Sequence, residues 1–153
     1  MRFLFNANIY ALILFSVLLT GFNSCAPSDK ISLDRTDLNF ANTRLLDAAM
    51  ADVFTPPVAS RIFAYTHLAH YLTYQSLEQE GLKDIQPQIN GLSEFDALDT
   101  IGVDAPLAAL FAFSKMGRKL IYSEHFFDEL DTELTEKALL NHYTEQEVAD
   151  AMA

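Results

Sequence analysis

Hydrophobic residues recur at three- and four-residue spacings through most of this chain, which is the pattern of amphipathic helices. No segment shows the strict alternation of a strand, and no internal repeat is present. Five helices are predicted, with bounds at 38 or 39–54, 57–79, 105–123, 126–143 and 144–152. The sequence therefore predicts an all-α fold, a helical bundle of about four to five helices.

Residues at the ends of these segments support the bounds. Asp37 is a candidate cap for the first helix, and Thr55 is a candidate cap for the second, which restarts at Pro56-Pro57 because proline ends one helix and is favoured in the first turn of another. Asp104 is a candidate cap for the third helix, and the segment 144–147 has the composition of a capping box.

The region 82–100 lacks a sustained period between Gly81, which we expect to close the second helix, and the cap at Asp104. We predict a long irregular crossing with a short turn at 93–98.

The amino terminus has the composition of a secretory signal. Arg2 precedes an almost unbroken apolar run over residues 3–19, and small or polar residues lead to Cys25, the only cysteine. The predicted organisation is a signal peptide at 1–24, a polar tether at 25–37 and a helical domain at 38–153.

The segment 19–25 resembles a lipobox, with Ser24 small before the cysteine, although Phe22 and Asn23 depart from the usual pattern. Cys25 is therefore the expected lipid anchor, and ordinary signal cleavage near the same position is the alternative. Either outcome implies export, and the first implies a membrane-anchored lipoprotein of the bacterial cell envelope.

Acidic residues dominate the charge, with 21 Asp and Glu against 10 Lys and Arg. Loss of Arg2 with the signal would change the formal net charge from −11 to −12. Such a surface argues against nucleic acid as a partner, and a membrane would have to be held through the anchor rather than through a basic face. The acidic residues concentrate after residue 123, where we expect a solvated helical face.

Two segments carry a family resemblance. The segment 45–71, with PPVASRIFAY at its centre, resembles the amino-terminal helical region of bacterial vanadium-dependent haloperoxidase relatives in the type 2 phosphatidic acid phosphatase superfamily. The segment 105–124 resembles a later helix of the same region. The resemblance implies that vanadate or phosphate would bind in a catalytic half outside these helices, so we expect no cofactor in this chain.

The catalytic motifs of that superfamily are an Arg-Pro motif, a Pro-Ser-Gly-His motif, and a Ser-Arg pair with a His six residues after the Arg. The sequence contains neither Arg-Pro nor Gly-His. Ser60-Arg61 followed by His67 fits the third spacing, but Tyr71 stands where an Asp is expected. We interpret this match as accidental, because one Arg cannot surround an oxyanion, and we predict no catalytic residue here.

Other side chains have both a functional and a structural interpretation. His67 and His70, three residues apart on a helix, have the spacing of a metal pair but lack further ligands nearby in the sequence, so packing or solvated roles are favoured and no metal is predicted. Arg61 is expected to clamp the end of the preceding helix. His125, beside Glu124, invites an acid-base or metal role that an exposed helix end explains equally well. The aromatic residues are expected in the core rather than around an apolar ligand.

These patterns favour an exported, lipid-anchored helical scaffold that corresponds to the amino-terminal part of a haloperoxidase-like or phosphatase-like enzyme, either truncated or persisting without an active site. Its partners would be the membrane and a missing catalytic domain or protein. The alternative is a self-sufficient helical surface lipoprotein that binds a partner or a small ligand. A large uncovered apolar face would favour the scaffold.

Overall fold

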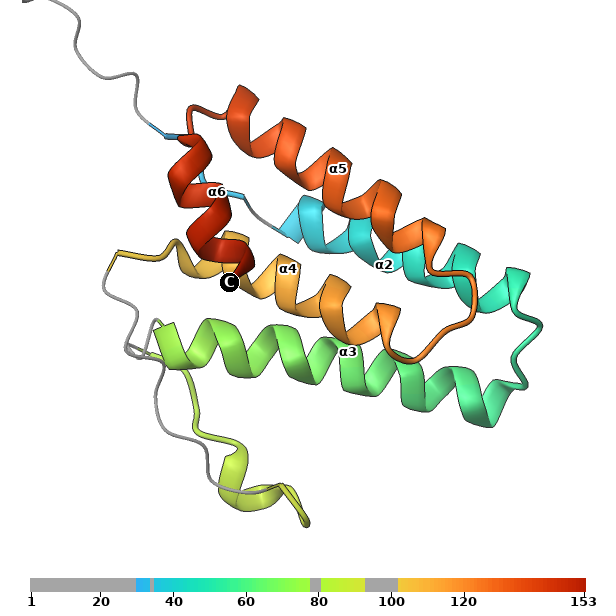
Figure 1. Cartoon of the computed structure of the whole chain (residues 1–153). Helices are drawn as coiled ribbons and strands as arrows, with labels where there is room; N and C mark the ends of the chain where they lie inside the picture. The colour runs from blue at the N-terminus through green and yellow to red at the C-terminus, as the bar shows by residue number, and fades with distance from the viewer. Residues whose placement is uncertain (1–29, 34, 78–80, 93–101) are drawn as a thin grey trace, which may run out of the picture.

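A computed structural model describes residues 30–33, 35–77, 81–92 and 102–153. These residues form five α-helices and one short 3-10 helix, with no strand among them (Figure 1). The elements are α2 (Arg35–Ala51), α3 (Pro56–Leu77), η1 (Gln86–Gln88), α4 (Ala105–Arg118), α5 (His125–Leu140) and α6 (Glu145–Met152). The predicted all-α fold is confirmed. The predicted signal at 1–24, Cys25 and the turn at 93–98 lie outside the described residues.

Helix α4 is the centre of the bundle and packs against α2, α3, α5 and α6. Figure 1 shows α2 and α5 together on one side of α4, α3 along the other side, and α6 crossing near its start. Nine of the 14 residues of α4 are buried, which is the burial expected of a central helix.

Aromatic side chains fill the core around α4. Phe111, Phe113 and Phe127 are at most 2% exposed, as predicted. Tyr65 and Tyr122 were also expected in the core, and that expectation is wrong, because they are 50% and 84% exposed. Phe127 of α5 lies against the backbone of Gly117 in α4, so closely that an added Cβ would stand 2.2 Å from the ring. The buried hydrophobic residues among those described run from Leu33 to Ala151.

The corner between α2 and α3 follows the two prolines. Helix α2 ends at Ala51, three residues before the predicted end, because Val53 adopts a left-handed conformation with φ of 54°. Helix α3 begins at Pro56, and the carbonyl of Thr55 accepts bonds from the backbone of Val58 and Ala59, both at 2.9 Å. The predicted restart is confirmed, one residue earlier than expected.

Helix α2 begins at Arg35 rather than at 38, so the predicted tether at 25–37 overlaps its first turn. Asp37 was expected to cap this helix but lies inside it, only 3% exposed. Its carboxylate forms an ion pair with Lys137 of α5. A contact between helices, which the local sequence pattern does not reveal, therefore sets the position of this residue.

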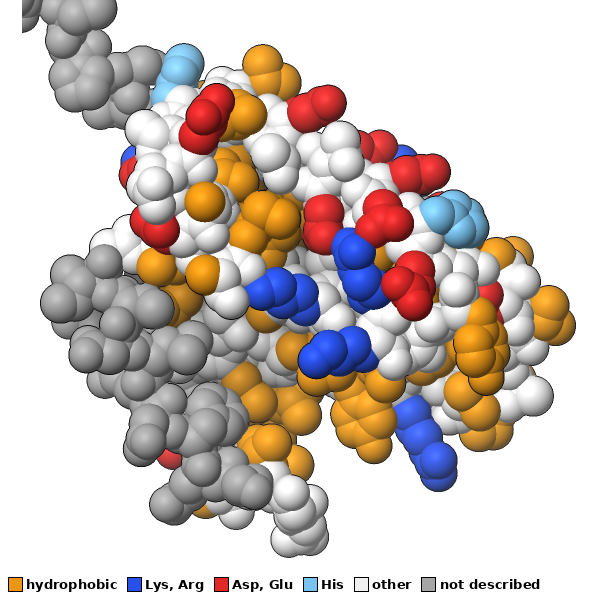
Figure 2. All heavy atoms as spheres, in the orientation of Figure 1, with side chains coloured by type: hydrophobic (Ala, Val, Ile, Leu, Met, Phe, Trp, Pro, Cys, Tyr) orange, Lys and Arg blue, Asp and Glu red, His pale blue; other side chains and the backbone are white. Residues whose placement is uncertain are grey.

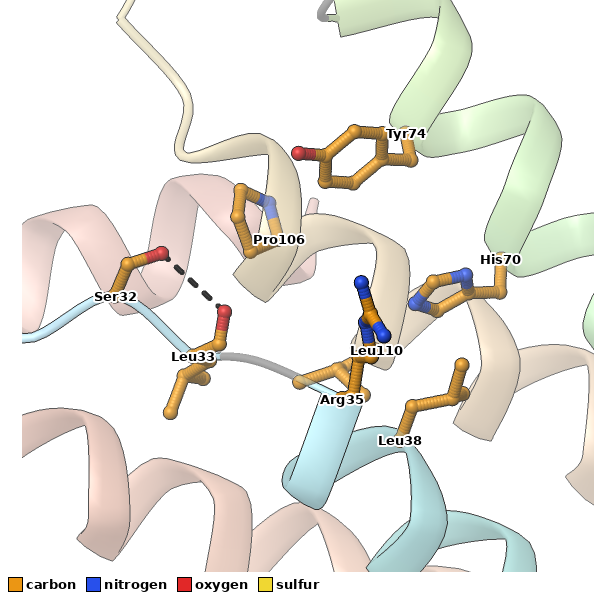
Figure 3. A pocket seen from close by; sticks show the side chains of 8 residues that line it. All are labelled: Ser32, Leu33, Arg35, Leu38, His70, Tyr74, Pro106 and Leu110. Carbon is orange, nitrogen blue, oxygen red and sulfur yellow. Dashed lines mark hydrogen bonds between the residues drawn. The ribbon is translucent and has the colours of Figure 1, made fainter. Parts of the chain in front are cut away.

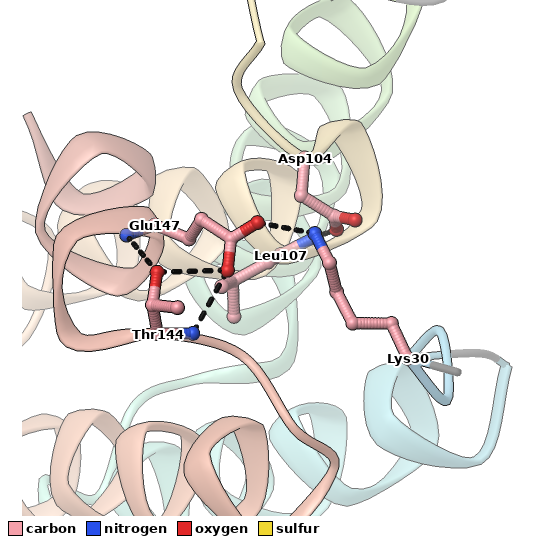
Figure 4. Close-up of polar contacts among 5 residues, drawn as sticks. All are labelled: Lys30, Asp104, Leu107, Thr144 and Glu147. Carbon is pink, nitrogen blue, oxygen red and sulfur yellow. Dashed lines mark hydrogen bonds and ion pairs between the residues drawn. The ribbon is translucent and has the colours of Figure 1, made fainter. Parts of the chain in front are cut away.

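The caps of α4 and α6 are confirmed. Asp104 accepts a bond from the backbone N–H of Leu107 at 3.1 Å, and Thr144 and Glu147 form the predicted capping box (Figure 4). Helix α5 begins and ends close to its predicted bounds.

Helix α4 ends at Arg118, five residues before the predicted Ser123. Asp52, at the end of α2, accepts bonds from the backbone N–H groups of Tyr122 (2.7 Å) and Ser123 (3.2 Å) and from the Ser123 hydroxyl (2.5 Å). These bonds hold residues 122–123 outside the helical path. Burial raises the pKa of Asp52, but the bonds from Ser123 and Tyr122 and the nearby His125 outweigh that effect and leave the pKa lowered.

The acidic face of α5 is only partly a solvated surface. Arg118 of α4 pairs with Asp128 and Asp131, both at 2.5 Å, and Arg44 of α2 pairs with Glu133 at 2.6 Å. These pairs join α5 to its two neighbouring helices. None of the described helices is both long enough and apolar enough to span a bilayer.

Candidate functional site

A pocket of about 340 Å³ lies where the segment before α2 meets α3 and the start of α4 (Figure 3). Eight residues line it: Ser32, Leu33, Arg35, Leu38, His70, Tyr74, Pro106 and Leu110. Most of the lining is apolar, and Arg35 is the only one of the eight that carries a charge at neutral pH.

His70 and Tyr74 form one wall of the pocket, one helical turn apart on α3. Their rings are stacked, with centroids 6.5 Å apart and planes inclined by 13°. Burial, with a smaller effect of the nearby His67, lowers the pKa of His70 to about 4, so the ring is neutral at physiological pH. In Figure 3 the guanidinium of Arg35 lies beside the imidazole of His70. The pocket therefore offers stacking surface and one exposed cation, a combination suited to a small amphipathic ligand.

The residues of the Ser-Arg-His match do not converge. Ser60 donates its hydroxyl to the carbonyl of Pro57 at 3.0 Å, in the first turn of α3. Arg61 is exposed, and His67, six residues later, lies about two-thirds of a turn away around the helix axis. The interpretation of this match as accidental is consistent with that geometry.

His67 instead contributes to the packing between helices. Its Nε2 lies 3.0 Å from Oδ1 of Asn42 on α2, and its ring meets Phe113 of α4 edge-on at 5.3 Å. Burial lowers the pKa of His67, which favours the neutral ring in this position. No local pattern indicated Asn42 as its partner, because the two residues lie on different helices.

The predicted clamp by Arg61 is wrong for the described residues, since this exposed side chain makes no hydrogen bond or ion pair with them. The end of α2 is held by Asp52 instead. No group of three or more His, Cys, Asp or Glu side chains in the described part of the chain has the geometry to hold a metal ion. His125 is exposed at the start of α5, where its ring packs on Phe126 at 4.4 Å.

Few side chains of α3 are buried, although its sequence is rich in apolar residues. Only Ile62, Thr66 and Leu72 of its 22 residues are buried. Val58 is 42% exposed and Tyr65 is 50% exposed, and because these two residues lie seven apart they share one face of the helix. We call this surface the outer face of α3. Figure 2 shows hydrophobic side chains along the edge where Figure 1 draws α3, while acidic side chains gather over α5.

The structure is similar to that of a bacterial vanadium-dependent iodoperoxidase, with a TM-score of 0.71 and 27% sequence identity. The match covers 82% of this chain. The chain has the fold of a helical region of a vanadium haloperoxidase. The resemblance predicted from the segments 45–71 and 105–124 is thereby confirmed.

This haloperoxidase-like region spans 30% of the iodoperoxidase chain that it matches. No protein-family model matches the sequence, and no curated protein matches it.

Proposed function

We propose that this chain is the helical scaffold of an exported vanadium haloperoxidase-like or phosphatase-like enzyme, and that the outer face of α3 packs against the part of that enzyme that carries the catalytic pocket. The observation that carries the proposal is the poor coverage of α3, an apolar helix with three buried residues beside a central helix with nine. The similarity to an iodoperoxidase, in which the matched region is 30% of the chain, supports it.

An exposed apolar face on a helix is unfavourable in water, at about 25 cal/mol per Å² of apolar area. Val58 and Tyr65 together present such a face, and Arg61 lies between them in the sequence of the same helix. Exposed apolar side chains on one helical face, with polar residues around them, are typical of an interface. A partner surface with apolar side chains opposite Val58 and Tyr65 and a carboxylate or carbonyl opposite Arg61 would complement it.

Vanadate or phosphate would not be held by the described residues of this chain. Either oxyanion needs several cationic and amide donors around it, whereas Arg35 is the only cation among the residues that line the pocket. In this proposal the oxyanion belongs to the remainder of the enzyme, and the scaffold contributes its packing surface.

The first test is to sequence the coding DNA beyond the codon for Ala153 in all three frames. A reading frame that encodes an Arg-Pro motif, a Pro-Ser-Gly-His motif and a Ser-Arg motif would support the scaffold proposal. If no frame encodes these motifs, the proposal is rejected in this form. The encoded segment would then be co-expressed with this chain, and vanadate-dependent oxidation of iodide and hydrolysis of a phosphate ester would be measured.

A matched pair of variants tests the interface in that co-expression. Tyr65→Asp places a charge on the outer face of α3 and should lower recovery of the complex at least tenfold, a loss of about 1.4 kcal/mol or more. Ala149→Asp adds the same charge at an exposed position of α6 and should leave recovery unchanged. Equal recovery of both variants would show that the partner does not use the outer face of α3.

Membrane anchoring is a separate part of the proposal. Residues 1–24 would be removed as a signal, and Cys25 would carry the lipid. Cells that express the full chain would be grown with a labelled fatty acid. Label should enter the wild-type chain and not Cys25→Ser, and an unlabelled wild-type chain would replace lipidation with ordinary signal cleavage.

A second candidate function is a self-sufficient surface lipoprotein that binds a small ligand. The pocket beside His70 favours it, because its volume of about 340 Å³ lies within the range of small-molecule sites. Two results together would favour this alternative. The chain would bind a small aromatic carboxylate and lose that binding in Arg35→Ala, and no reading frame beyond Ala153 would encode the catalytic motifs.

A further inference from the structure

Three exposed hydrophobic residues gather at the end of the fold where residue 30 lies. Leu140 is 78% exposed, Ile31 is 60% exposed and Leu139 is 41% exposed. The backbone N–H of Ile31 donates to the carbonyl of Asn141 at 3.2 Å, so Ile31 lies directly beside the end of α5. We call Ile31, Leu139 and Leu140 the terminal apolar patch.

This end of the fold is fixed to the segment that follows the proposed anchor. Lys30 forms an ion pair with Glu147 of α6, drawn in Figure 4, and its ammonium lies 5.0 Å from the centre of the Tyr143 ring. Hydrogen bonds from Lys30 and then from Thr144 lower the pKa of Glu147 to about 2, so the pair stays charged over the physiological range. Residue 30 is thus held beside α6 and the end of α5.

The distance from the anchor is short. Lys30 is five positions after Cys25 along the chain, and five extended residues span at most about 18 Å. A lipid on Cys25 would therefore keep the terminal apolar patch within reach of the membrane surface. Val53, which is 84% exposed, lies beyond the far end of α2, a helix of 17 residues that is about 25 Å long.

The charges around the patch suit an apolar contact with lipid. The two lysines nearest to it are paired, Lys30 with Glu147 and Lys137 with Asp37. Among the described residues, neither of these lysines is available to recruit anionic headgroups. Arg35 at the start of α2 is an exposed cation, but the acidic chain as a whole disfavours such headgroups. Exposed leucine and isoleucine side chains gain free energy by entering the boundary between headgroups and acyl chains of an uncharged surface.

We propose that the terminal apolar patch inserts into the surface of the membrane that holds the Cys25 lipid, and so fixes the orientation of the helical bundle on that membrane. The inference rests on the anchoring in the proposed function. A patch in contact with lipid would place the start of α2, the end of α5 and α6 at the membrane and the α2–α3 corner away from it.

The sequence allows a test that does not depend on how cells process Cys25. The chain contains no tryptophan, and Cys25 is its only cysteine. The chain from residue 25 to residue 153, which keeps the whole described core, would be coupled through Cys25 to a maleimide lipid in phosphatidylcholine vesicles. Leu140→Trp then reports on the patch, and Val53→Trp is the matched control at the other end of α2.

With brominated phosphatidylcholine in the vesicles, we expect the fluorescence of Leu140→Trp to shift to the blue and to be quenched at least twofold more than that of Val53→Trp. Circular dichroism of both variants checks that they fold. Because Leu140 is exposed, its replacement removes no core contact. A second variant, Ile31→Trp, should be quenched like Leu140→Trp.

Equal quenching of the patch and control variants, or none in either, would overturn the proposal. A blue shift of Leu140→Trp that grows with protein concentration and needs no vesicles would also overturn it, because another copy of the chain would then cover the patch. Lipidation of Cys25 is tested separately from the patch. Absence of fatty-acid label from the cellular protein would reject lipidation, whereas the quenching in vesicles coupled to the chain would be unaffected.

Discussion

The contact between Gly117 and Phe127 gives the sharpest prediction, because two physical effects oppose each other there. Gly117 lies in the last turn of α4, where Gly→Ala by itself stabilises a helix by about 1 kcal/mol. The added Cβ would lie 2.2 Å from Cζ and 2.3 Å from Cε1 of Phe127. Ordinary carbon contacts are about 3.5 Å or longer, so the ring or the helix must move by more than about 1 Å.

Such a movement is costly in this position. Phe127 is fully buried, in contact with the core around α4, and its ring has no solvent-facing space to enter. Overpacking a core costs about 1–3 kcal/mol. A displacement of this size belongs at the upper end of that range, so Gly117→Ala should lose about 1–2 kcal/mol of stability after the helical gain is subtracted.

Urea unfolding followed by far-ultraviolet circular dichroism measures this change. Phe127→Leu removes the atoms nearest to the new Cβ, so the double variant Gly117→Ala/Phe127→Leu should be more stable than the sum of the two single changes predicts, by at least about 0.5 kcal/mol. If Gly117→Ala is as stable as the wild type or more stable, helix propensity decides the outcome and the close packing of α4 against α5 is wrong.

Three further changes test other parts of the structure. Asp104→Ala should lower stability by about 1 kcal/mol in urea unfolding, because it removes the bond to the backbone of Leu107; an unchanged midpoint would mean that the cap is not formed. Asp52→Ala should lower the free energy of unfolding by about 2 kcal/mol, and Ser123→Ala by about half as much, because the second removes only one of the three hydrogen bonds to Asp52. Equal losses would contradict this set of bonds. The pKa of His70 is near 6.5 in the unfolded chain and about 4 in the folded chain. Burial of the neutral ring therefore keeps its full stability above pH 6.5, and the fold loses stability as the pH falls toward 4, because the unfolded chain binds the proton more tightly. The full pKa shift corresponds to about 3 kcal/mol, and solvent screening of the partly exposed ring reduces this to about 1–2 kcal/mol. The thermal stability of His70→Phe should therefore fall less than that of the wild type between neutral pH and pH 4. Parallel curves of melting temperature against pH for the two proteins would refute the burial of this ring.

Local features were predicted well from the sequence. The restart at Pro56-Pro57, the cap at Asp104 and the box at 144–147 depend on residues within one or two turns, and all three are present. The helical segments followed from apolar spacing, which needs no knowledge of the partner.

Features that depend on partners far along the chain were missed. The start of α2 and the end of α4 differ from prediction because Asp37 meets Lys137, 100 residues away, and Asp52 meets Ser123, 71 residues away. The pocket joins residues of three segments, so the importance of Arg35 beside His70 could not be seen in either local pattern. The match of Ser60, Arg61 and His67 was judged accidental from the sequence on another ground, because one Arg cannot surround an oxyanion.

The attachment of Lys30 to α6 has a mechanical consequence. A pull applied at Cys25 would reach the bundle first at Lys30, where the load is shared by the ion pair to Glu147 and, one residue later, by the bond from Ile31 to Asn141. Both contacts resist from the last two helices of the chain rather than from α2. Tension on the anchor would thus load the contacts to Glu147 and Asn141 before it stretches α2, so these contacts shield α2 from the force.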